Sequence, residues 1–483
     1  MRGASTLCTL GTVLLSLFHA INALHIGDTG SLKVVRFDLQ RREISNPIES
    51  DRLRKRSKKV VKTKIKNHIL IYTCEVKLGN PPQKVALHVD TGSSDLWTNA
   101  VNTTFYDDLE GYKPSVAYDP GASSTAAFLS SDFNIKYSDL SGAEGDYLSD
   151  TLRIGGVKLA DFQFGVGYRS VCKEGVMGIG YPVNEIQALR NKKPSYANLP
   201  FALKNAGLIK SAAYSVWLNG VNTKHGSLLF GGIDKAKYHG KLQTIPILPD
   251  ANGIYREVLV SLKEISVTAK KGKDTHSVGG EGLPIPVLLD TGSALTYLPP
   301  STIRDLYKEF SVGYIEQLDL SVIPCDRKYR DAKITFTFTT PTAAPSITIE
   351  LAKLILPMPL DDDGKPLATA ESGRPPLCLF GIFPTGYGVK YPSLGVTFLR
   401  DAYLFINLEK NEVGMAQAKS NVWREKIREV NNGEGGRPAT EHLMRRTTTT
   451  TTSPMKAFAM PMARPDMYIG TLVGLAGVIF AMM

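Results

Sequence analysis

The stretch that decides the fold runs from His88 to Trp97 and reads HVDTGSSDLW. A related stretch, LLDTGSALTYLP, runs from Leu288 to Pro299 and repeats the Asp-Thr-Gly-Ser core 200 residues later. Each copy follows apolar residues, and each is followed by two residues and a glycine, Val176-Met177-Gly178 in the first half and Ser393-Leu394-Gly395 in the second. Two similar halves with one aspartate each predict two lobes that face each other across a cleft.

The chemistry of an Asp-Thr-Gly triplet depends on its being paired with a second one. Glycine permits a tight turn after a strand, so its backbone amide can approach the preceding carboxylate, while the threonine hydroxyls can brace one loop against the other. Two adjacent carboxylates cannot both ionise, so one accepts a proton from a bound water while the other, protonated, polarises a carbonyl. We therefore expect Asp90 and Asp290 to be catalytic, with supporting loops made of Thr91, Gly92, Ser93, Thr291, Gly292 and Ser293.

Short β segments dominate the chain between about residues 60 and 420. They alternate or run apolar and are separated by turn residues; examples are HILIYTCEVKLG (68–79), KVALHVD (84–90) and KITFTFTT (333–340). Helical signals are confined to NLPFALKNAG (198–207) and STIRDLYKEF (301–310). This pattern predicts an all-β architecture.

With these motifs the sequence resembles the pepsin-like aspartic proteases, and it is most similar to the fungal branch anchored by glycosylphosphatidylinositol (GPI), the yapsins and their relatives. The resemblance covers about residues 68 to 418 and is supported by GVMGIGYPVNE (175–185) and LGVTFLRDAYLFIN (394–407). It implies an all-β, bilobal pepsin-like fold, with an N-terminal catalytic lobe at 57–232, a C-terminal catalytic lobe at 233–420 and the active site between them. It also implies an endopeptidase that acts on polypeptide substrates without a cofactor.

The resemblance further implies a mobile hairpin, the flap, which closes over the substrate. Residues 133–152 fit this hairpin, and Tyr137 would hydrogen-bond Trp97 and exclude water from the cleft. Asp139, two residues past the tyrosine, would lie at the rim of the pocket for the residue before the cut bond, where it could bind a lysine or arginine. We expect cleavage after basic as well as hydrophobic residues; the alternative is that Asp139 caps the turn and faces solvent.

The N-terminal end is typical of a targeting signal. Arg2 supplies a positive charge, an apolar run follows, and Ala23 is the expected last residue of a signal peptide at 1–23; the run is too short for a transmembrane anchor. Residues 24–56 form an expected pro-segment that ends in Arg54-Lys55-Arg56, a site for a processing protease. The alternative is an ordinary solvated run of charges.

The C-terminal end also has the composition of a targeting signal. Residues 421–466 form a Gly/Thr-rich stalk with six consecutive threonines, and 467–483 form an apolar tail that reaches the last residue. This order predicts a GPI signal, a GPI-anchored lipoprotein and a location at the cell surface, on the plasma membrane or in the cell wall. A tail-anchored helix and the absence of any anchor are the alternatives.

Cysteines and sequons add local expectations. Cys8 leaves with the signal peptide, and the remaining four cysteines allow three disulfide connectivities, of which Cys74–Cys172 and Cys325–Cys378 are the simplest because each stays within one lobe. Asn102 is the one N-x-S/T sequon and is a candidate for glycosylation. The spacings typical of metal sites are absent, so we expect no metal.

Charge and motif searches weigh against other classes. The net charge of +11 includes the basic run between Asp51 and Lys66, so we expect no nucleic-acid partner, and we expect a monomer. A serine hydrolase would need GxSxG and a dinucleotide-binding protein GxGxxG, and neither string occurs. An inactive homologue that serves as a wall-bound binding protein is the remaining alternative, and the intact Asp-Thr-Gly-Ser at both sites argues against it.

Overall fold

The computed structural model describes residues 33–44, 69–106, 111–113, 116–137, 141–221, 223, 225–268, 274–326, 331–340, 344–360, 364–386 and 389–430. The predicted signal peptide and apolar tail, most of the predicted pro-segment and stalk, and Asp139 lie outside these residues. All described residues belong to one compact unit within residues 1–437. No helix in this part of the chain is long and apolar enough to cross a membrane.

The largest element is a 13-stranded sheet whose strands come from both halves of the sequence. Its order is β12-β26-β25-β9-β10-β1-β2-β3-β8-β4-β7-β6-β5. The strands are β1 (Val35–Ile44), β2 (Ile69–Leu78), β3 (Gln83–Asp90), β4 (Leu96–Phe105), β5 (Ala127–Lys136), β6 (Gly142–Ile154), β7 (Val157–Ser170), β8 (Gly175–Gly178), β9 (Ala213–Trp217), β10 (His225–Phe230), β12 (Gln243–Pro246), β25 (Ala402–Asn407) and β26 (Glu412–Gln417).

The second half of the chain forms further sheets of its own. An eight-stranded sheet contains β13 (Leu259–Thr268), β14 (Thr275–Val278), β15 (Ile285–Leu289), β16 (Thr296–Leu298), β19 (Lys333–Phe338), β20 (Ser346–Glu350), β23 (Ile382–Pro384) and β24 (Ser393–Leu394). Two small sheets contain β17 (Gly313–Ile315), β18 (Leu320–Pro324), β21 (Ile355–Leu356) and β22 (Leu377–Phe380), and β11 (Gly232–Asp234) with β27 (Ile427–Glu429).

Helices are few and short. They are α2 (Ile186–Leu189), α3 (Leu199–Asn205), α4 (Pro300–Phe310) and α5 (Val396–Leu399), and α3 and α4 fall in the two ranges predicted from the sequence. The prediction of a mostly-β, pepsin-like architecture is confirmed.

The internal repeat of the sequence is also a repeat of strand pairing. In the first half β3 runs parallel to β8, which places Asp90 opposite Gly178. In the second half β15 runs parallel to β24, which places Leu289 opposite Leu394. Each aspartate therefore stands at the end of a strand that is held by the apolar-Gly element of its own half.

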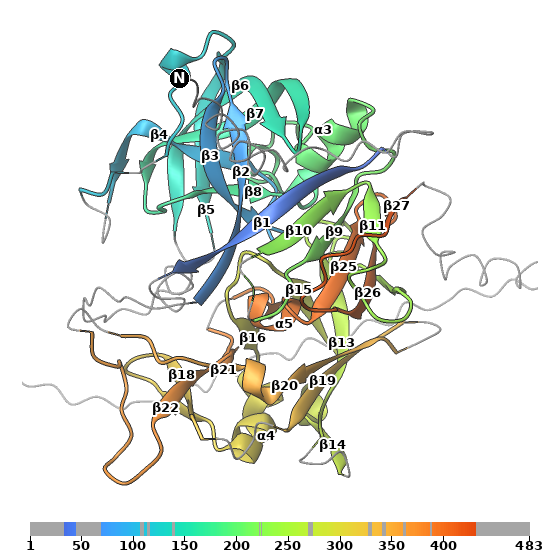
Figure 1. Cartoon of the computed structure of the whole chain (residues 1–483). Helices are drawn as coiled ribbons and strands as arrows, with labels where there is room; N and C mark the ends of the chain where they lie inside the picture. The colour runs from blue at the N-terminus through green and yellow to red at the C-terminus, as the bar shows by residue number, and fades with distance from the viewer. Residues whose placement is uncertain are drawn as a thin grey trace, which may run out of the picture. The chain divides into compact units, whose positions relative to one another are not determined.

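The predicted pro-segment contributes a strand to the centre of the large sheet. β1 pairs antiparallel with β10 on one side, from Val35 opposite Phe230, and with β2 on the other, from Gln40 opposite Thr73. Figure 1 shows β1, in blue, beside β10 and β2. Its alternate residues Phe37 and Leu39 are buried in the main hydrophobic core, as the period of two in a half-buried strand requires.

One predicted disulfide is present and the other is wrong. Cys325, just after β18, is bonded to Cys378 in β22. Cys74 and Cys172 are not bonded to each other. The physical reason is that the two side chains belong to different clusters. Cys74 lies in the main core, with its Sγ 3.7 Å from the sulfur of Met177, while Cys172 packs beside the cluster around Trp97. Burial raises the pKa of the Cys74 thiol to about 12, which keeps it protonated.

Candidate active site

The two aspartates of the repeat occupy equivalent places in the two halves. Asp90 is the last residue of β3, and Asp290 directly follows β15. Both are buried, with 3% and 6% of their surfaces exposed. A carboxylate this buried needs hydrogen-bond donors close by, because water no longer solvates it.

Each carboxylate receives the same two donors from its own loop. The Gly92 amide donates to Asp90 Oδ1 at 2.8 Å, and the Ser93 hydroxyl donates to Asp90 Oδ2 at 2.6 Å. In the other half Gly292 and Ser293 make the matching bonds to Asp290, again at 2.8 Å and 2.6 Å. The two loops therefore hold both carboxylates in one orientation each.

The two threonines join the halves to each other. The Thr91 hydroxyl donates to the Leu289 carbonyl at 2.7 Å and accepts the Thr291 amide at 3.0 Å. The Thr291 hydroxyl donates to the Val89 carbonyl at 2.8 Å and accepts the Thr91 amide at 3.1 Å. These four buried bonds form a symmetric brace that fixes the two aspartate loops relative to each other.

The glycines are required because the carboxylates approach them closely. A Cβ added to Gly292 would lie 2.5 Å from Asp90 Oδ1 and 2.9 Å from Asp290 Oδ1. A Cβ added to Gly92 would lie 2.9 Å from Asp290 Oδ1 and 3.3 Å from Asp90 Oδ1. Both inner carboxylate oxygens therefore border the same small space, and any side chain at either glycine would enter it.

A cleft of about 1000 Å³, part of it open to solvent, lies over the two carboxylates. The lining residues that come from the half of the chain with Asp90, here named the wall beside Asp90, are Asp95, Ile135, Lys136, Tyr137, Asn184, Ile186, Leu189 and Arg190. Those from the half with Asp290, here named the wall beside Asp290, are Glu257, Leu288, Val389, Lys390 and Tyr391. The space suits an extended peptide better than a small metabolite, because it runs across both halves of the site.

Tyr137 stands at the base of the flap and faces this cleft. Its hydroxyl accepts a hydrogen bond from Trp97 Nε1 at 2.8 Å. Desolvation, with the nearby negative charge of Asp90, raises the pKa of Tyr137 well above its ordinary value, so the hydroxyl remains neutral. Asp139 lies among residues 138–140, outside the described part of the chain, so its side chain is not placed.

The comparison with known families decides the class. A model of the eukaryotic aspartyl proteases matches residues 71–418. The chain belongs to this family.

Curated relatives of this aspartyl protease come from fungi. It is 42% identical over 406 residues to "Probable aspartic-type endopeptidase opsB" of Aspergillus oryzae, which covers 84% of this chain and 80% of the relative. It is 36% identical over 440 residues to the protein of the same name from Arthroderma benhamiae, covering 91% and 87%. An "Acid protease" of Saccharomycopsis fibuligera is 32% identical over 377 residues, covering 78% and 88%. The protein is an aspartic-type endopeptidase.

Behind the Asp90 wall, the protease has a buried acidic pair that sequence reasoning missed. Asp95 accepts hydrogen bonds from the Tyr147 hydroxyl at 2.8 Å, the Tyr196 hydroxyl at 3.0 Å and the Ile186 amide at 2.9 Å. Glu185 is fully buried and accepts the Tyr196 amide at 2.9 Å. Burial raises the pKa of both carboxyls, that of Glu185 to about 9. The sequence did offer one sign that Asp95 matters, because this residue lies inside the DTGSSDLW motif.

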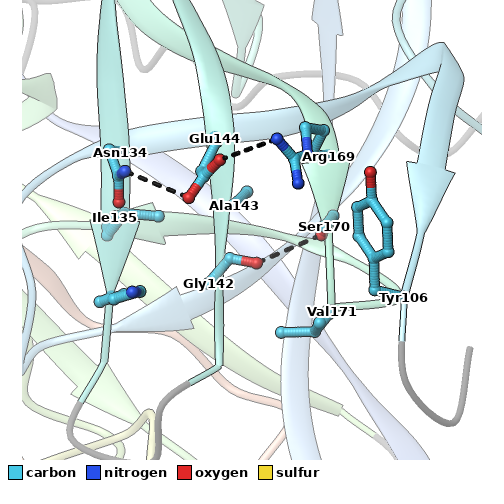
Figure 2. A pocket seen from close by; sticks show the side chains of 10 residues that line it. Tyr106, Asn134, Ile135, Gly142, Ala143, Glu144, Arg169, Ser170 and Val171 are labelled. Carbon is cyan, nitrogen blue, oxygen red and sulfur yellow. Dashed lines mark hydrogen bonds and ion pairs between the residues drawn. The ribbon is translucent and has the colours of Figure 1, made fainter.

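A second pocket, shown in Figure 2, is lined by residues of β5, β6 and β7 and shares Ile135 and Lys136 with the cleft. Glu144 lies there between Asn134, whose amide donates to it at 3.2 Å, and Arg169, at 3.7 Å. The Glu144 carboxylate therefore has Asn134 and Arg169 as its partners in this pocket.

Asn102, the sequon residue, is exposed in β4. No group of three or more His, Cys, Asp or Glu side chains that could hold a metal occurs among the described residues.

Proposed function

We propose that this endopeptidase hydrolyses peptide bonds with a water molecule held between Asp90 and Asp290. The observation that carries the proposal is the symmetric brace, which holds two equivalent carboxylates against one small space. Two carboxylates held this close to each other cannot both ionise, so a pair of this kind shares one proton.

The reaction follows from that shared proton. The ionised carboxylate accepts a proton from the water, whose oxygen bonds to the peptide carbonyl carbon. The protonated carboxylate donates its proton to the carbonyl oxygen, so a neutral tetrahedral diol forms. The C–N bond then breaks as the amine takes a proton from one aspartate and a diol hydroxyl returns its proton to the other. The products are a carboxylic acid and an amine, and the pair again holds one proton.

The flap supplies closure over this reaction. Tyr137, held by Trp97, closes the cleft on the side of Asp90. Exclusion of bulk water strengthens the hydrogen bonds of the carboxylates to the reacting atoms. Asp139, two residues past Tyr137 in the sequence, is proposed to bind a lysine or arginine before the cut bond, beside a general preference for hydrophobic residues.

We also propose that the enzyme is made with a signal peptide, is activated by cleavage after Arg56 and is held at the cell surface by a GPI anchor, with glycan on Asn102. The composition of the two ends supports the signal peptide, the cleavage and the anchor. The 31% identity over 364 residues to "Secreted aspartic protease 4" of Candida albicans supports secretion alone. The exposure of Asn102 is compatible with a glycan there.

A cleavage profile tests the catalytic proposal. The mature protein and its Asp290→Asn variant are incubated with a mixed peptide library at several pH values, with the exposed Asp305→Asn on α4 as the matched control. We expect Asp290→Asn to lose all but about 1% of activity, the scale of removing an essential acid–base group, while its thermal unfolding stays close to that of the wild type. Activity above a few per cent in Asp290→Asn would contradict the proposal.

A further inference from the structure

Glu257 is a carboxylate in the cleft to which the reaction gives no role. It precedes β13, and its side chain lies in the wall beside Asp290 together with Leu288 and Tyr391. Only 19% of the side chain is exposed. A half-buried acid that lines a substrate cleft costs desolvation free energy unless a partner compensates it, so its partners decide what it can bind.

The interactions of the Glu257 carboxylate with cationic side chains in the described structure are weak. Its Oε2 is buried and meets Lys390 Nζ at 3.5 Å, a long contact at the limit of hydrogen-bond length. Lys390 is itself 60% exposed and lies over the Tyr391 ring, 4.7 Å from its centre. The neighbouring Arg256 is engaged elsewhere, with Asp250 at 2.8 Å. Glu257 therefore keeps most of its capacity to bind a cation.

The position of Glu257 fixes which part of a substrate would meet it. The cut bond lies over the two aspartates, and an extended peptide points successive side chains to opposite sides, so the two residues that flank the cut bond face opposite walls. The wall beside Asp90 contains the base of the flap, where the residue before the cut bond is expected to bind. The wall beside Asp290 contains Glu257 and therefore receives the residue after the cut bond.

We propose that Glu257 forms a subsite for a lysine or arginine immediately after the cut bond. This inference rests on the catalytic role of Asp90 and Asp290 proposed above. The aliphatic part of the basic side chain packs along Leu288 and Val389, and its charged end reaches the Glu257 carboxylate. Lys390 yields its place and remains in solvent over Tyr391; its side chain is 60% exposed, and the incoming cation replaces its charge beside the buried Glu257 carboxylate.

The pH dependence of this subsite follows from the groups around Glu257. Burial raises the pKa of Glu257; the charges of Lys390 and Arg256 act against the rise, and that of Asp250 adds to it. Glu257 therefore stays protonated up to a higher pH than an ordinary glutamate does. Because only the ionised form attracts a cation, the preference for a basic residue after the cut bond should increase as pH rises.

The test compares peptides that differ only after the cut bond, with lysine, methionine or glutamine there and one constant hydrophobic residue before it. For Glu257→Gln we expect kcat/KM of the lysine peptide to fall about tenfold, the scale of one charge-assisted hydrogen bond, with the methionine peptide unchanged. Lys390→Met should raise kcat/KM of the lysine peptide. The matched control is Glu75→Gln, an exposed glutamate paired with Lys84 at 3.2 Å on the surface.

Each outcome separates this inference from the proposed function. Suppose that the wild type and Glu257→Gln both cleave the methionine peptide and show the same ratio of kcat/KM between the lysine and methionine peptides. The subsite is then absent, while the catalytic proposal stands. A parallel fall for all three peptides in Glu257→Gln would mean that Glu257 shapes the wall, and this also overturns the subsite. A wild type that cleaves none of them contradicts the catalytic proposal itself.

Discussion

At the scale of single residues, Glu185 shows how a buried acid outside the reaction links stability to pH. It is fully buried, its Oε2 accepts only the Tyr196 amide, and its Oε1 has no hydrogen-bond partner among the described residues. Burial raises its pKa from 4.5 to about 9. The folded protein therefore holds a proton on Glu185 below about pH 9.

The sign of the resulting pH effect is fixed. Below pH 4.5 both the folded and the unfolded chain carry the proton, and the stabilisation is fully present. Between pH 4.5 and about 9 only the folded chain holds it. The free energy of unfolding therefore falls as pH rises, by at most about 1.4 kcal/mol per unit. Glu185→Gln should flatten this part of the profile, measured by urea unfolding from pH 4 to 8; parallel profiles would contradict the prediction.

The aspartate loops could be predicted at this scale, because their residue types leave few options. The repeated Asp-Thr-Gly-Ser string already marks both requirements. Its glycine cannot tolerate a Cβ beside two carboxylates, and its threonine forms hydrogen bonds to the other half. Glu257 and Glu185 could not be predicted. Their environments depend on residues distant in the sequence, Lys390 for Glu257 and Asp95 for Glu185, and no local pattern marks them.

At the scale of elements, the segment after α2 holds the first strand of the flap. Arg190 donates to the carbonyls of Asn134 at 3.0 Å and Lys136 at 3.1 Å, both at the end of β5. Further along the same segment, Lys193 pairs with Asp132 at 2.6 Å. Because Lys136 directly precedes Tyr137, Arg190 acts on the point where the strand becomes the flap.

Loss of this contact should affect catalysis more than folding. Arg190→Ala should lower kcat/KM about fivefold and alike for all substrates, because flap position, not substrate recognition, changes. Arg190→Lys should recover part of the loss. Lys193→Ala, which removes a contact further from the tyrosine, is the control and should stay near the wild type. Steady-state kinetics on several peptides check this; an effect confined to one substrate class would instead show that Arg190 contacts the substrate.

At the scale of the whole molecule, the strand content and the twofold repeat could be predicted from the sequence. Which distant segments pair with each other could not. The expected pro-segment was interpreted by its polar composition, although Val35, Phe37 and Leu39 alternate with Arg36 and Asp38 as a half-buried strand does. Spacing alone also could not separate a core cysteine such as Cys74 from a bridged one. Both questions depend on which distant segments pack together.

The Cys325–Cys378 bridge gives a prediction at this scale, because it closes a long segment of the second half. The two cysteines are 53 residues apart. Loss of a cross-link over a loop of this length costs about 2–5 kcal/mol. A Cys325→Ser/Cys378→Ser double variant should unfold at lower temperature in calorimetry, and reductant should lower the midpoint of the wild type but leave that of the variant unchanged. Equal sensitivity of both proteins to reductant would contradict the role of this bridge.

The place of β1 in the large sheet has a consequence for the activated enzyme. If the chain is cut after Arg56, as proposed above, a strand that was part of the same molecule becomes a separate peptide, held between β2 and β10 by pairing and by Phe37 and Leu39. Its occupancy then obeys mass action, so dilution favours its release and any other segment that fits the gap competes with it. One hydrolysis would thus turn a fixed structural element into a ligand, and make the thermal stability of the protease depend on its own concentration.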